Sequence, residues 1–142
     1  MITCIVIDDN QDIVNVFCDL LKISGIEVIA TGTDGMEAIE LYEKHHPDII
    51  FVDLIMPRYD GFYAIENIKK TDPNAKIIVV TGDLTLNEGD LLDLHNAAAV
   101  IYKPFDMSKV KQVMADVFLE NIKLPKSNKY HAYDDLKKNN LE

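Results

Sequence analysis

Five short runs of β-branched and other apolar residues alternate with stretches in which apolar residues recur at helical spacing. The runs cover residues 2–7, 28–31, 49–52, 76–80 and 99–102. Three of them are almost continuously apolar, which is typical of strands buried on both faces of a parallel sheet. The alternation therefore predicts an α/β domain, a doubly wound parallel sheet with helices on both faces.

The stretches between these runs have the apolar periodicity of helices that pack on such a sheet. The clearest stripe lies near the end of the chain and consists of Val110, Val113, Met114, Val117 and Phe118. A first helix carries a stripe from Ile13 to Leu21, and Gly25 follows where a left-handed C-terminal cap belongs. Further helices are predicted over residues 36–44, 62–70 and 84–96, the last one weakened by Gly89 in its middle.

Length and composition fit a single folded domain. The chain has 142 residues, of which 48% are hydrophobic and 27% charged, so it can bury enough apolar surface to fold and does not belong to the disordered class. After Lys123 the sequence becomes polar and linker-like. We therefore predict a domain over residues 1–123, followed by a polar C-terminal tail or linker over residues 124–142.

The formal net charge of −10 disfavours binding to nucleic acid or to an anionic membrane surface. No apolar run approaches the roughly 20 residues that a membrane span needs, and the N-terminus lacks the basic flank of a secretion signal. We therefore expect a cytoplasmic protein. Cys4 and Cys18 lie in apolar segments without metal-ligand spacing, which predicts two buried, reduced thiols.

Polar residues stand where several of the predicted strands end. Asp8 and Asp9 follow the first run, Asp53 the third, Thr81 the fourth and Lys103 the fifth. An open parallel sheet binds its ligands outside the carboxyl ends of its strands, so these side chains are predicted to meet at one edge.

Three carboxylates at one edge repel each other unless a cation is bound between them. Mg²⁺ prefers oxygen ligands and typically uses one or two protein carboxylates, so Asp9, Asp53 and a nearby backbone carbonyl form a candidate site, with Asp8 acting through water. The alternative is that the polar residues only cap helices, as Asp9 or Asn10 is able to do for the first helix.

The same residues resemble the receiver domains of two-component response regulators. The matching motifs are Asp8-Asp9, the segment from Asp53 to Pro57 with Gly61 eight residues after Asp53, Thr81-Gly82 and Lys103-Pro104-Phe105. The resemblance extends from about residue 1 to about residue 123. It implies a flavodoxin-like (βα)5 fold with strand order 2-1-3-4-5.

The resemblance also implies a function. Asp53 would accept a phosphoryl group from a sensor histidine kinase or phosphotransfer protein, and Mg²⁺ would be bound by Asp9, Asp53 and the carbonyl of Ile55, supported by Asp8. Lys103 and Thr81 would contact the phosphoryl group, and the Lys103-Pro104 peptide would be cis. The chain would then be no conventional enzyme but a phosphorylation switch. It would signal to a downstream protein through the fourth helix, fifth strand and last helix, with a possible homodimer.

Two departures from the family pattern affect this expectation. The family commonly has an aromatic residue three positions before the lysine, where this chain has Val100, so the usual aromatic switch is in doubt. Tyr102 is expected on the other face of the strand and is no simple substitute. Ile55, two residues after Asp53, cannot orient a hydrolytic water, and Asp83 opposes the approach of an anion, which predicts slow self-dephosphorylation.

Two other functions are compatible with the fold. A haloacid-dehalogenase-type phosphatase also uses a strand-end aspartate with Mg²⁺, but it needs a second aspartate where this chain has Ile55. The other alternative is a receiver-like interaction module whose partner binds regardless of phosphorylation.

Overall fold

The computed structural model describes residues 1–83, 85–87, 89–90 and 94–118. The strands are β1 (Thr3–Ile7), β2 (Glu27–Gly32), β3 (Ile49–Val52), β4 (Ile77–Thr81) and β5 (Ala99–Tyr102). The helices are α1 (Gln11–Ile23), α2 (Gly35–His45), α3 (Gly61–Thr71) and α5 (Met107–Phe118), with a short 3₁₀ helix, η1 (Leu94–Asn96). Each strand begins and ends within one residue of its predicted run.

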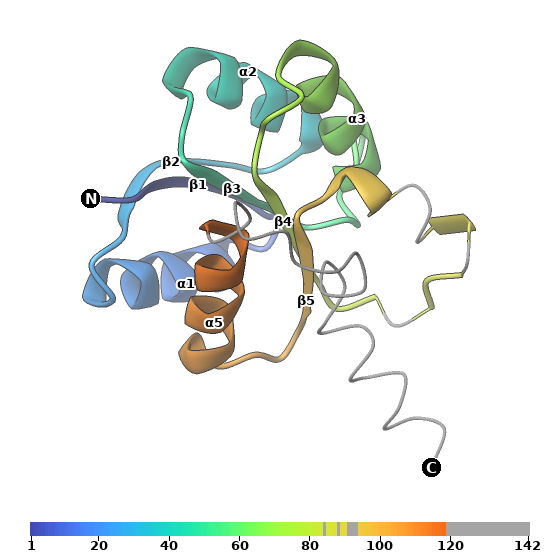
Figure 1. Cartoon of the computed structure of the whole chain (residues 1–142). Helices are drawn as coiled ribbons and strands as arrows, with labels where there is room; N and C mark the ends of the chain where they lie inside the picture. The colour runs from blue at the N-terminus through green and yellow to red at the C-terminus, as the bar shows by residue number, and fades with distance from the viewer. Residues whose placement is uncertain (84, 88, 91–93, 119–142) are drawn as a thin grey trace.

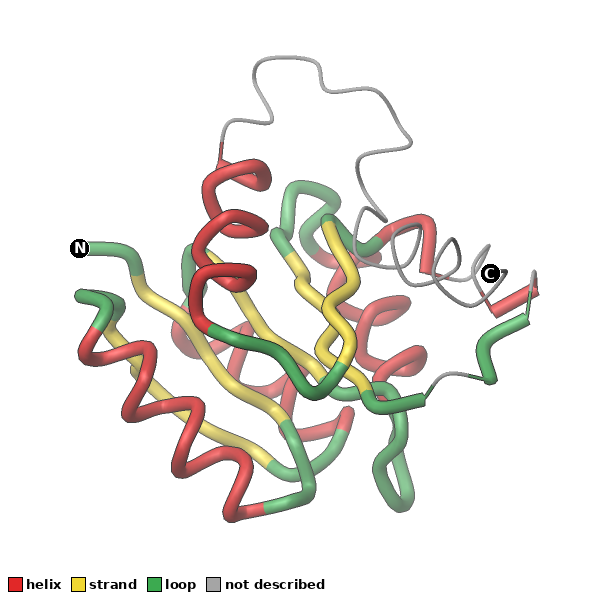
Figure 2. The backbone as a smooth tube through the Cα atoms, turned by 90° about the horizontal axis from the view of Figure 1, so that it is seen from below, coloured by secondary structure: helices red, strands yellow, loops and turns green. Residues whose placement is uncertain are grey.

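The strands form one parallel sheet in the order β2-β1-β3-β4-β5, as expected for the flavodoxin-like arrangement. Helices α2 and α3 cover one face, and α1 and α5 cover the other (Figure 1). Figure 2, turned to view the molecule from the side of α1 and α5, shows the strands running side by side behind these two helices. The predicted doubly wound α/β fold is confirmed.

The core has two layers because the central strands are buried on both faces. Residues of β3 and β4 are all buried, and alternate residues contribute to opposite sides of the sheet. On the α1 and α5 side, the ring of Phe17 packs edge-on against Phe51 and Phe105, with centroids 5.0 and 5.2 Å apart. This packing joins α1 to β3 and to the segment that follows β5.

Both cysteines are buried and free, as predicted. Cys4 is fully buried in β1. Burial, with a smaller contribution from Cys18, raises the pKa of the Cys4 thiol to about 12. The reactive thiolate form is therefore strongly disfavoured at neutral pH.

Local polar side chains determine where the helices begin. Asn10 caps α1, because its side-chain oxygen accepts hydrogen bonds from the backbone N–H groups of Asp12 and Ile13. Of the two candidates for this cap, the structure therefore selects Asn10. The α1 helix ends before Gly25, whose φ of 83° is the left-handed conformation predicted for it.

The helix predicted over residues 84–96 differs from the structure. Residues 85–87 are not helical, residues 89–90 are helical, and 94–96 form η1. The backbone N–H of Thr85 is bound by the Asp83 side chain, and Asn87 and Asp90 each accept a hydrogen bond from the other's backbone N–H, as at a capped helix start. The predicted start at residue 84 was therefore wrong.

Residues 84, 88 and 91–93 of that helix lie outside the described residues, as does the whole predicted tail 124–142. In the part of the chain that is described, no helix combines the length and the apolar character needed to cross a bilayer.

Candidate functional site

The predicted site residues lie at the carboxyl edge of the sheet because backbone hydrogen bonds extend the strand pairing beyond the strands. Asp8, Asp53 and Lys103 directly follow β1, β3 and β5, and Thr81 is the last residue of β4. The bonds join Asp8 N to Gly32 O (3.1 Å), Asp53 N to Ile7 O (2.9 Å) and Lys103 N to Thr81 O (2.9 Å). The parallel ladder thus fixes the backbone of each residue relative to its neighbouring strand.

Three carboxylates converge at this edge. One oxygen atom from each of Asp8, Asp9 and Asp53 lies within 4.8 Å of the other two. Asp8 and Asp53 are buried, with 5% and 8% of their surface exposed, whereas Asp9 is exposed. The three carboxylates thus meet at one edge, as predicted; the predicted site has Asp9 and Asp53 as direct ligands of a cation and Asp8 acting through water.

Lys103 extends into the same cluster. Its Nζ atom lies 2.6 Å from Oδ2 of Asp8 and 3.5 Å from Oδ2 of Asp53. The three carboxylates and one ammonium group carry a net charge of −2, which a divalent cation neutralises. Because every available ligand is an oxygen atom, the donor set fits a hard cation such as Mg²⁺.

The environment of Asp53 raises the pKa of its carboxyl. Burial is the largest cause and raises the pKa of this carboxyl above its ordinary value, and the neighbouring charge of Asp8 adds to the effect. The Lys103 ammonium and hydrogen bonds from the backbone N–H groups of Leu54 and Ile55 oppose it. A bound cation next to Asp53 would therefore favour the ionised carboxylate, the form in which it is a nucleophile.

Thr81 lies at the same edge and is fully buried. Its hydroxyl oxygen accepts a hydrogen bond of 3.1 Å from the backbone N–H of Asp83, which ties the loop after β4 to the site. A pocket of about 500 Å³ brings together all six predicted site residues: Asp8, Asp9, Asp53, Ile55, Thr81 and Lys103. The Ile55 side chain itself is 58% exposed.

The loop after β3 is folded tightly around Asp53, and Gly61 makes this possible. The Gly61 N–H donates to the carbonyl of Leu54 at 2.9 Å. A Cβ atom at position 61 would lie only 2.3 Å from the backbone carbonyl oxygen of Asp53. Glycine is therefore required here by close approach of two backbone segments.

A second anchor of this loop was missed by sequence reasoning. The buried Asp34 caps α2, and its Oδ2 atom lies 3.6 Å from the guanidinium of Arg58, which has a left-handed φ of 69°. The N–H of Gly35 also donates to the carbonyl of Tyr59 at 2.7 Å. The sequence Asp34 to Glu37 signals a helix cap, but nothing in it indicates the contact with Arg58.

The structure corrects one expectation about β5. Val100 and Tyr102 belong to the same core cluster, on the side of the sheet covered by α2 and α3. The prediction that Tyr102 points to a different face from position 100 was wrong, because a step of two residues along a strand returns to the same face. The cis peptide expected at Lys103-Pro104 is confirmed.

Comparison with known proteins agrees with this geometry. A family model described as the response regulator receiver domain matches residues 4–115. The chain belongs to the response regulator receiver family. This assignment favours a receiver domain of two-component signalling over the phosphatase alternative.

The receiver domain is similar to chemotaxis proteins of several organisms. It is 35% identical over 115 residues to the chemotaxis protein CheY of Thermotoga maritima, covering 80% of this chain and 94% of that protein. It is 31% identical to CheY of Bacillus subtilis over 112 residues, covering 78% and 92%. Binding of Mg²⁺ and phosphorylation are typical of the family to which these proteins belong.

Solved structures of relatives include complexes with Mg²⁺. In the CheX-CheY-BeF₃-Mg²⁺ complex of Borrelia burgdorferi, one chain matches with a TM-score of 0.74 and 31% identity, covering 82% of this chain and 89% of that chain. The response regulator TrrA of Thermotoga maritima, in complex with Mg²⁺-BeF, matches with a TM-score of 0.75 and 26% identity, covering 82% and 99%.

Proposed function

We propose that this receiver domain is a phosphorylation switch in which Asp53 accepts a phosphoryl group from a phosphohistidine of a sensor kinase or phosphotransfer protein. The observation that carries the proposal is the position of Asp53. It is a nearly buried carboxylate that shares an oxygen cluster with Asp8 and Asp9 and has the Lys103 ammonium within 3.5 Å. Phosphoryl transfer depends mainly on such positioning and on neutralising oxygen charge.

The transfer step is a displacement at phosphorus. A carboxylate oxygen of Asp53 forms the new O–P bond while the P–N bond to the donor imidazole breaks, and the released imidazole takes up a proton from solvent. The product is an aspartyl phosphate. Lys103 is close enough to both Asp8 and Asp53 to place its positive charge beside the transferred group.

Asp9, Asp53 and the carbonyl of Ile55 would hold Mg²⁺, with Asp8 contributing through water. When bound, the ion supplies charge neutralisation for the phosphoryl oxygens. The support from the structure is the shared oxygen cluster of the three aspartates and the presence of Ile55 in the same pocket.

The phosphoryl group adds about −1.5 to −2 charge in the usual side-chain esters, and we propose that the Thr81 hydroxyl donates to it. In the present structure this hydroxyl accepts a bond from the N–H of Asp83. Rotation of Thr81 toward Asp53 would break that bond and release the loop after β4. The surface formed by the segment after β4, by β5 and by α5 would then change, and a downstream protein target would bind the changed surface. The net negative charge of the chain argues against a nucleic acid as the target.

An apolar groove next to the site supports docking of a phosphodonor protein. The groove of about 530 Å³ is lined by Ile13, Val16 and Leu20 of α1 and by Pro104 and Phe105, and it also reaches Lys103. Val16 is 60% exposed there. The groove shares Ile13 and Lys103 with the pocket around Asp53, so a donor protein bound there would lie next to that pocket, and the exposed apolar side chains provide a surface for it.

Intact-mass analysis tests the chemistry directly. We expect the protein to gain one phosphoryl group when it is incubated with Mg²⁺ and a small acyl phosphate. We expect no gain for Asp53→Asn or when the Mg²⁺ is chelated, whereas Asp60→Asn, which changes a nearby helix cap, should still be labelled. Labelling of the Asp53→Asn protein at the wild-type rate would refute the assignment.

The same variant distinguishes a phosphorylation switch from a phosphorylation-independent module. If the protein is a phosphorylation switch, its downstream partner should bind the phosphorylated wild-type protein more tightly than it binds the Asp53→Asn variant. Equal binding of both proteins by the partner would favour the interaction module.

A further inference from the structure

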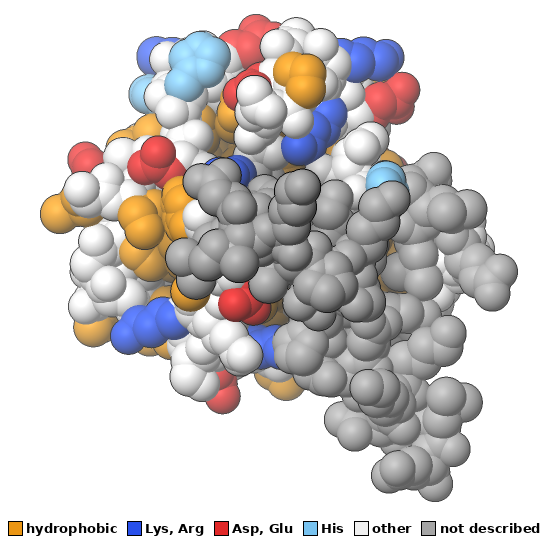
Figure 3. All heavy atoms as spheres, in the orientation of Figure 1, with side chains coloured by type: hydrophobic (Ala, Val, Ile, Leu, Met, Phe, Trp, Pro, Cys, Tyr) orange, Lys and Arg blue, Asp and Glu red, His pale blue; other side chains and the backbone are white. Residues whose placement is uncertain are grey.

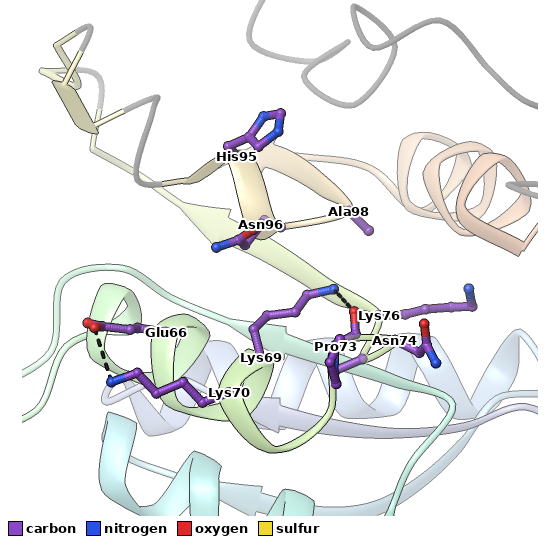
Figure 4. A pocket seen from close by; sticks show the side chains of 11 residues that line it. Glu66, Lys69, Lys70, Pro73, Asn74, Lys76, His95, Asn96 and Ala98 are labelled. Carbon is purple, nitrogen blue, oxygen red and sulfur yellow. Dashed lines mark hydrogen bonds and ion pairs between the residues drawn. The ribbon is translucent and has the colours of Figure 1, made fainter.

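A second hollow lies at the opposite edge of the sheet from Asp53, between the end of α3 and η1 (Figure 4). Its volume is about 900 Å³. It is lined by the end of α3, by residues 73–76 that lead into β4 and by residues 95–98 that precede β5. It shares no lining residue with the pocket around Asp53, so it is a separate feature of the molecule.

Basic side chains gather around this hollow although the chain as a whole has a net charge of −10. Lys69, Lys70 and Lys76 line it together with His95, and the acidic residue among the described lining is Glu66. Three lysines and one glutamate give this lining a charge of +2. On the face shown in Figure 3, Lys and Arg side chains lie over α3. A local reversal of charge of this kind attracts small anions.

Helix electrostatics explain only part of this cluster. Lys69 and Lys70 lie in the last turn of α3, where cations interact favourably with the helix dipole. Lys76 lies just before β4, and His95 belongs to η1. Separate segments of the chain thus bring basic side chains to the same hollow, which the dipole of α3 does not require.

The walls of the hollow are held in place by their own hydrogen bonds. Their backbone N–H groups donate within the protein: Asn74 to Asp72 Oδ1 (3.0 Å), Ala75 to Asp72 O (3.1 Å), Ala97 to Leu94 O (2.9 Å) and Ala98 to Ile77 O (2.8 Å). Ala75 and Ala97 are also buried in the core. A ligand would therefore meet a preformed site and would be recognised by side chains.

The basic side chains are distributed along the hollow. Figure 4 shows Lys70 beside Glu66 at one end, Lys76 at the other and Lys69 between them. The Nζ atom of Lys69 is positioned by a bond of 3.1 Å to the carbonyl of Pro73. The Lys70–Glu66 pair, at 3.4 Å, joins side chains that are both about two-thirds exposed, and such surface pairs contribute little, so an anion competes with it readily.

We propose that this hollow binds a small polyphosphate anion, such as inorganic triphosphate or the phosphate chain of a nucleoside triphosphate. Lysine binds phosphate as a point charge, and an elongated anion with several charged groups is attracted by more than one lysine of such a lining. The volume lies within the range of about 300–1,000 Å³ that is usual for small-molecule sites. The Asn74 and Asn96 amides, which also line the hollow, provide further donors.

The test is an NMR titration of the ¹⁵N-labelled full chain, in EDTA, with inorganic triphosphate and with ATP in separate experiments. The backbone amide signals of four residues that line the hollow are expected to change their chemical shifts until the site is saturated: Lys69, Asn74, Lys76 and Asn96. Lys69→Gln/Lys76→Gln should weaken binding about tenfold. The charge-matched control Lys22→Gln/Lys111→Gln, on the exposed surfaces of α1 and α5, should leave it unchanged, and so should Asp53→Asn.

The two ligands separate the sources of the anion. Equal affinity identifies the phosphate chain alone as the recognised group, and tighter binding of ATP identifies a nucleotide. Shifts confined to the pocket around Asp53, an equal loss of affinity in both double variants, or no saturation up to about 10 mM would overturn the proposal. Thermal unfolding of each double variant establishes that a loss of binding does not reflect a loss of fold.

Discussion

The side chains of Lys103 and Asp8 are joined by a contact of 2.6 Å across 95 positions of the sequence. The Lys103 ammonium thus lies against one of the carboxylates that the proposed Mg²⁺ site uses. The same lysine is 3.5 Å from Asp53. A cation that enters the cluster must share these carboxylates with the lysine.

Replacing Lys103 with methionine should therefore affect metal binding and phosphorylation in opposite directions. Removal of the competing positive charge changes the charge of the cluster from −2 to −3, so Mg²⁺ affinity should rise about fivefold, or ~1 kcal/mol. Phosphorylation by a small donor should slow at least about tenfold, because one neutralising group is lost. Isothermal titration and intact-mass kinetics measure the two effects.

Lys111→Met, on the exposed side of α5, should change neither. Weaker Mg²⁺ binding by Lys103→Met would contradict the competition.

Ile55 offers a test of the slow dephosphorylation predicted for this chain. Its side chain is 58% exposed at the mouth of the pocket and has no group that orients water. Ile55→Asn should shorten the lifetime of phosphorylated Asp53 at least about threefold, because an amide is able to position a hydrolytic water. The decay is followed by intact mass after the donor is removed. Val16→Asn changes an equally exposed apolar residue on α1 and should have no effect. A wild-type lifetime of seconds would contradict the prediction itself.

Gly61 and Gly82 flank the site but differ in the space around them. A Cβ atom at Gly61 would lie 2.3 Å from the Asp53 carbonyl oxygen, whereas one at Gly82 would meet the Lys103 side chain at 4.0 Å. Gly61→Ala should therefore lower the free energy of unfolding by about 2 kcal/mol through overpacking, whereas Gly82→Ala should stay within about 0.5 kcal/mol of wild type. Urea unfolding checks both values. Equal stability of the two variants would show that the loop after β3 adjusts without strain.

The bond between Tyr42 and Asp72 predicts a pH dependence of stability. The Tyr42 hydroxyl donates to Asp72 Oδ2 at 2.7 Å, and this bond is the main cause that lowers the pKa of Asp72. Tyr42→Phe should cost about 1 kcal/mol at neutral pH. Because a lowered pKa stabilises the folded state only while the carboxyl is ionised, this difference should shrink as the pH falls below the usual value of about 3.8, through the pKa of Asp72 in the folded protein.

Thermal unfolding between pH 2 and 7 measures this change. Tyr63→Phe serves as the control, since the Tyr63 ring packs against Tyr59 and the change removes only its hydroxyl. A loss for Tyr42→Phe that stays constant down to about pH 2 would assign the effect to packing and not to the bond with Asp72.

The sheet and its acidic edge were both predictable from the apolar runs of the sequence. Strands buried on both faces need continuous apolar runs, so the first polar residue after each run marks the strand end. Asp8, Asp53 and Lys103 were found in this way, and the parallel topology places strand ends together.

The pairwise contacts were not predictable, because they depend on side-chain geometry between distant segments. Sequence alone gave no reason for Lys103 to lie closer to Asp8 than to Asp53, or for Arg58 to reach Asp34. The basic hollow was not predictable either, because its lysines and His95 come from separate segments and no single segment indicates the cluster. The start of the helix predicted at residue 84 failed for a different reason: the Asp83 and Asn87 side chains bind nearby backbone N–H groups and compete with helix formation.

The hydrogen bonds that place Asp8, Asp53 and Lys103 join each of them to a neighbouring strand, and Lys103 is held by its bond to Thr81 of β4. During translation, the ammonium group is therefore absent until β5 has left the ribosome and paired with β4. A nascent chain that already carries the aspartates lacks this part of the machinery. If Asp53 accepts a phosphoryl group as proposed, the complete site is therefore assembled only after the last strand has been made and has joined the sheet.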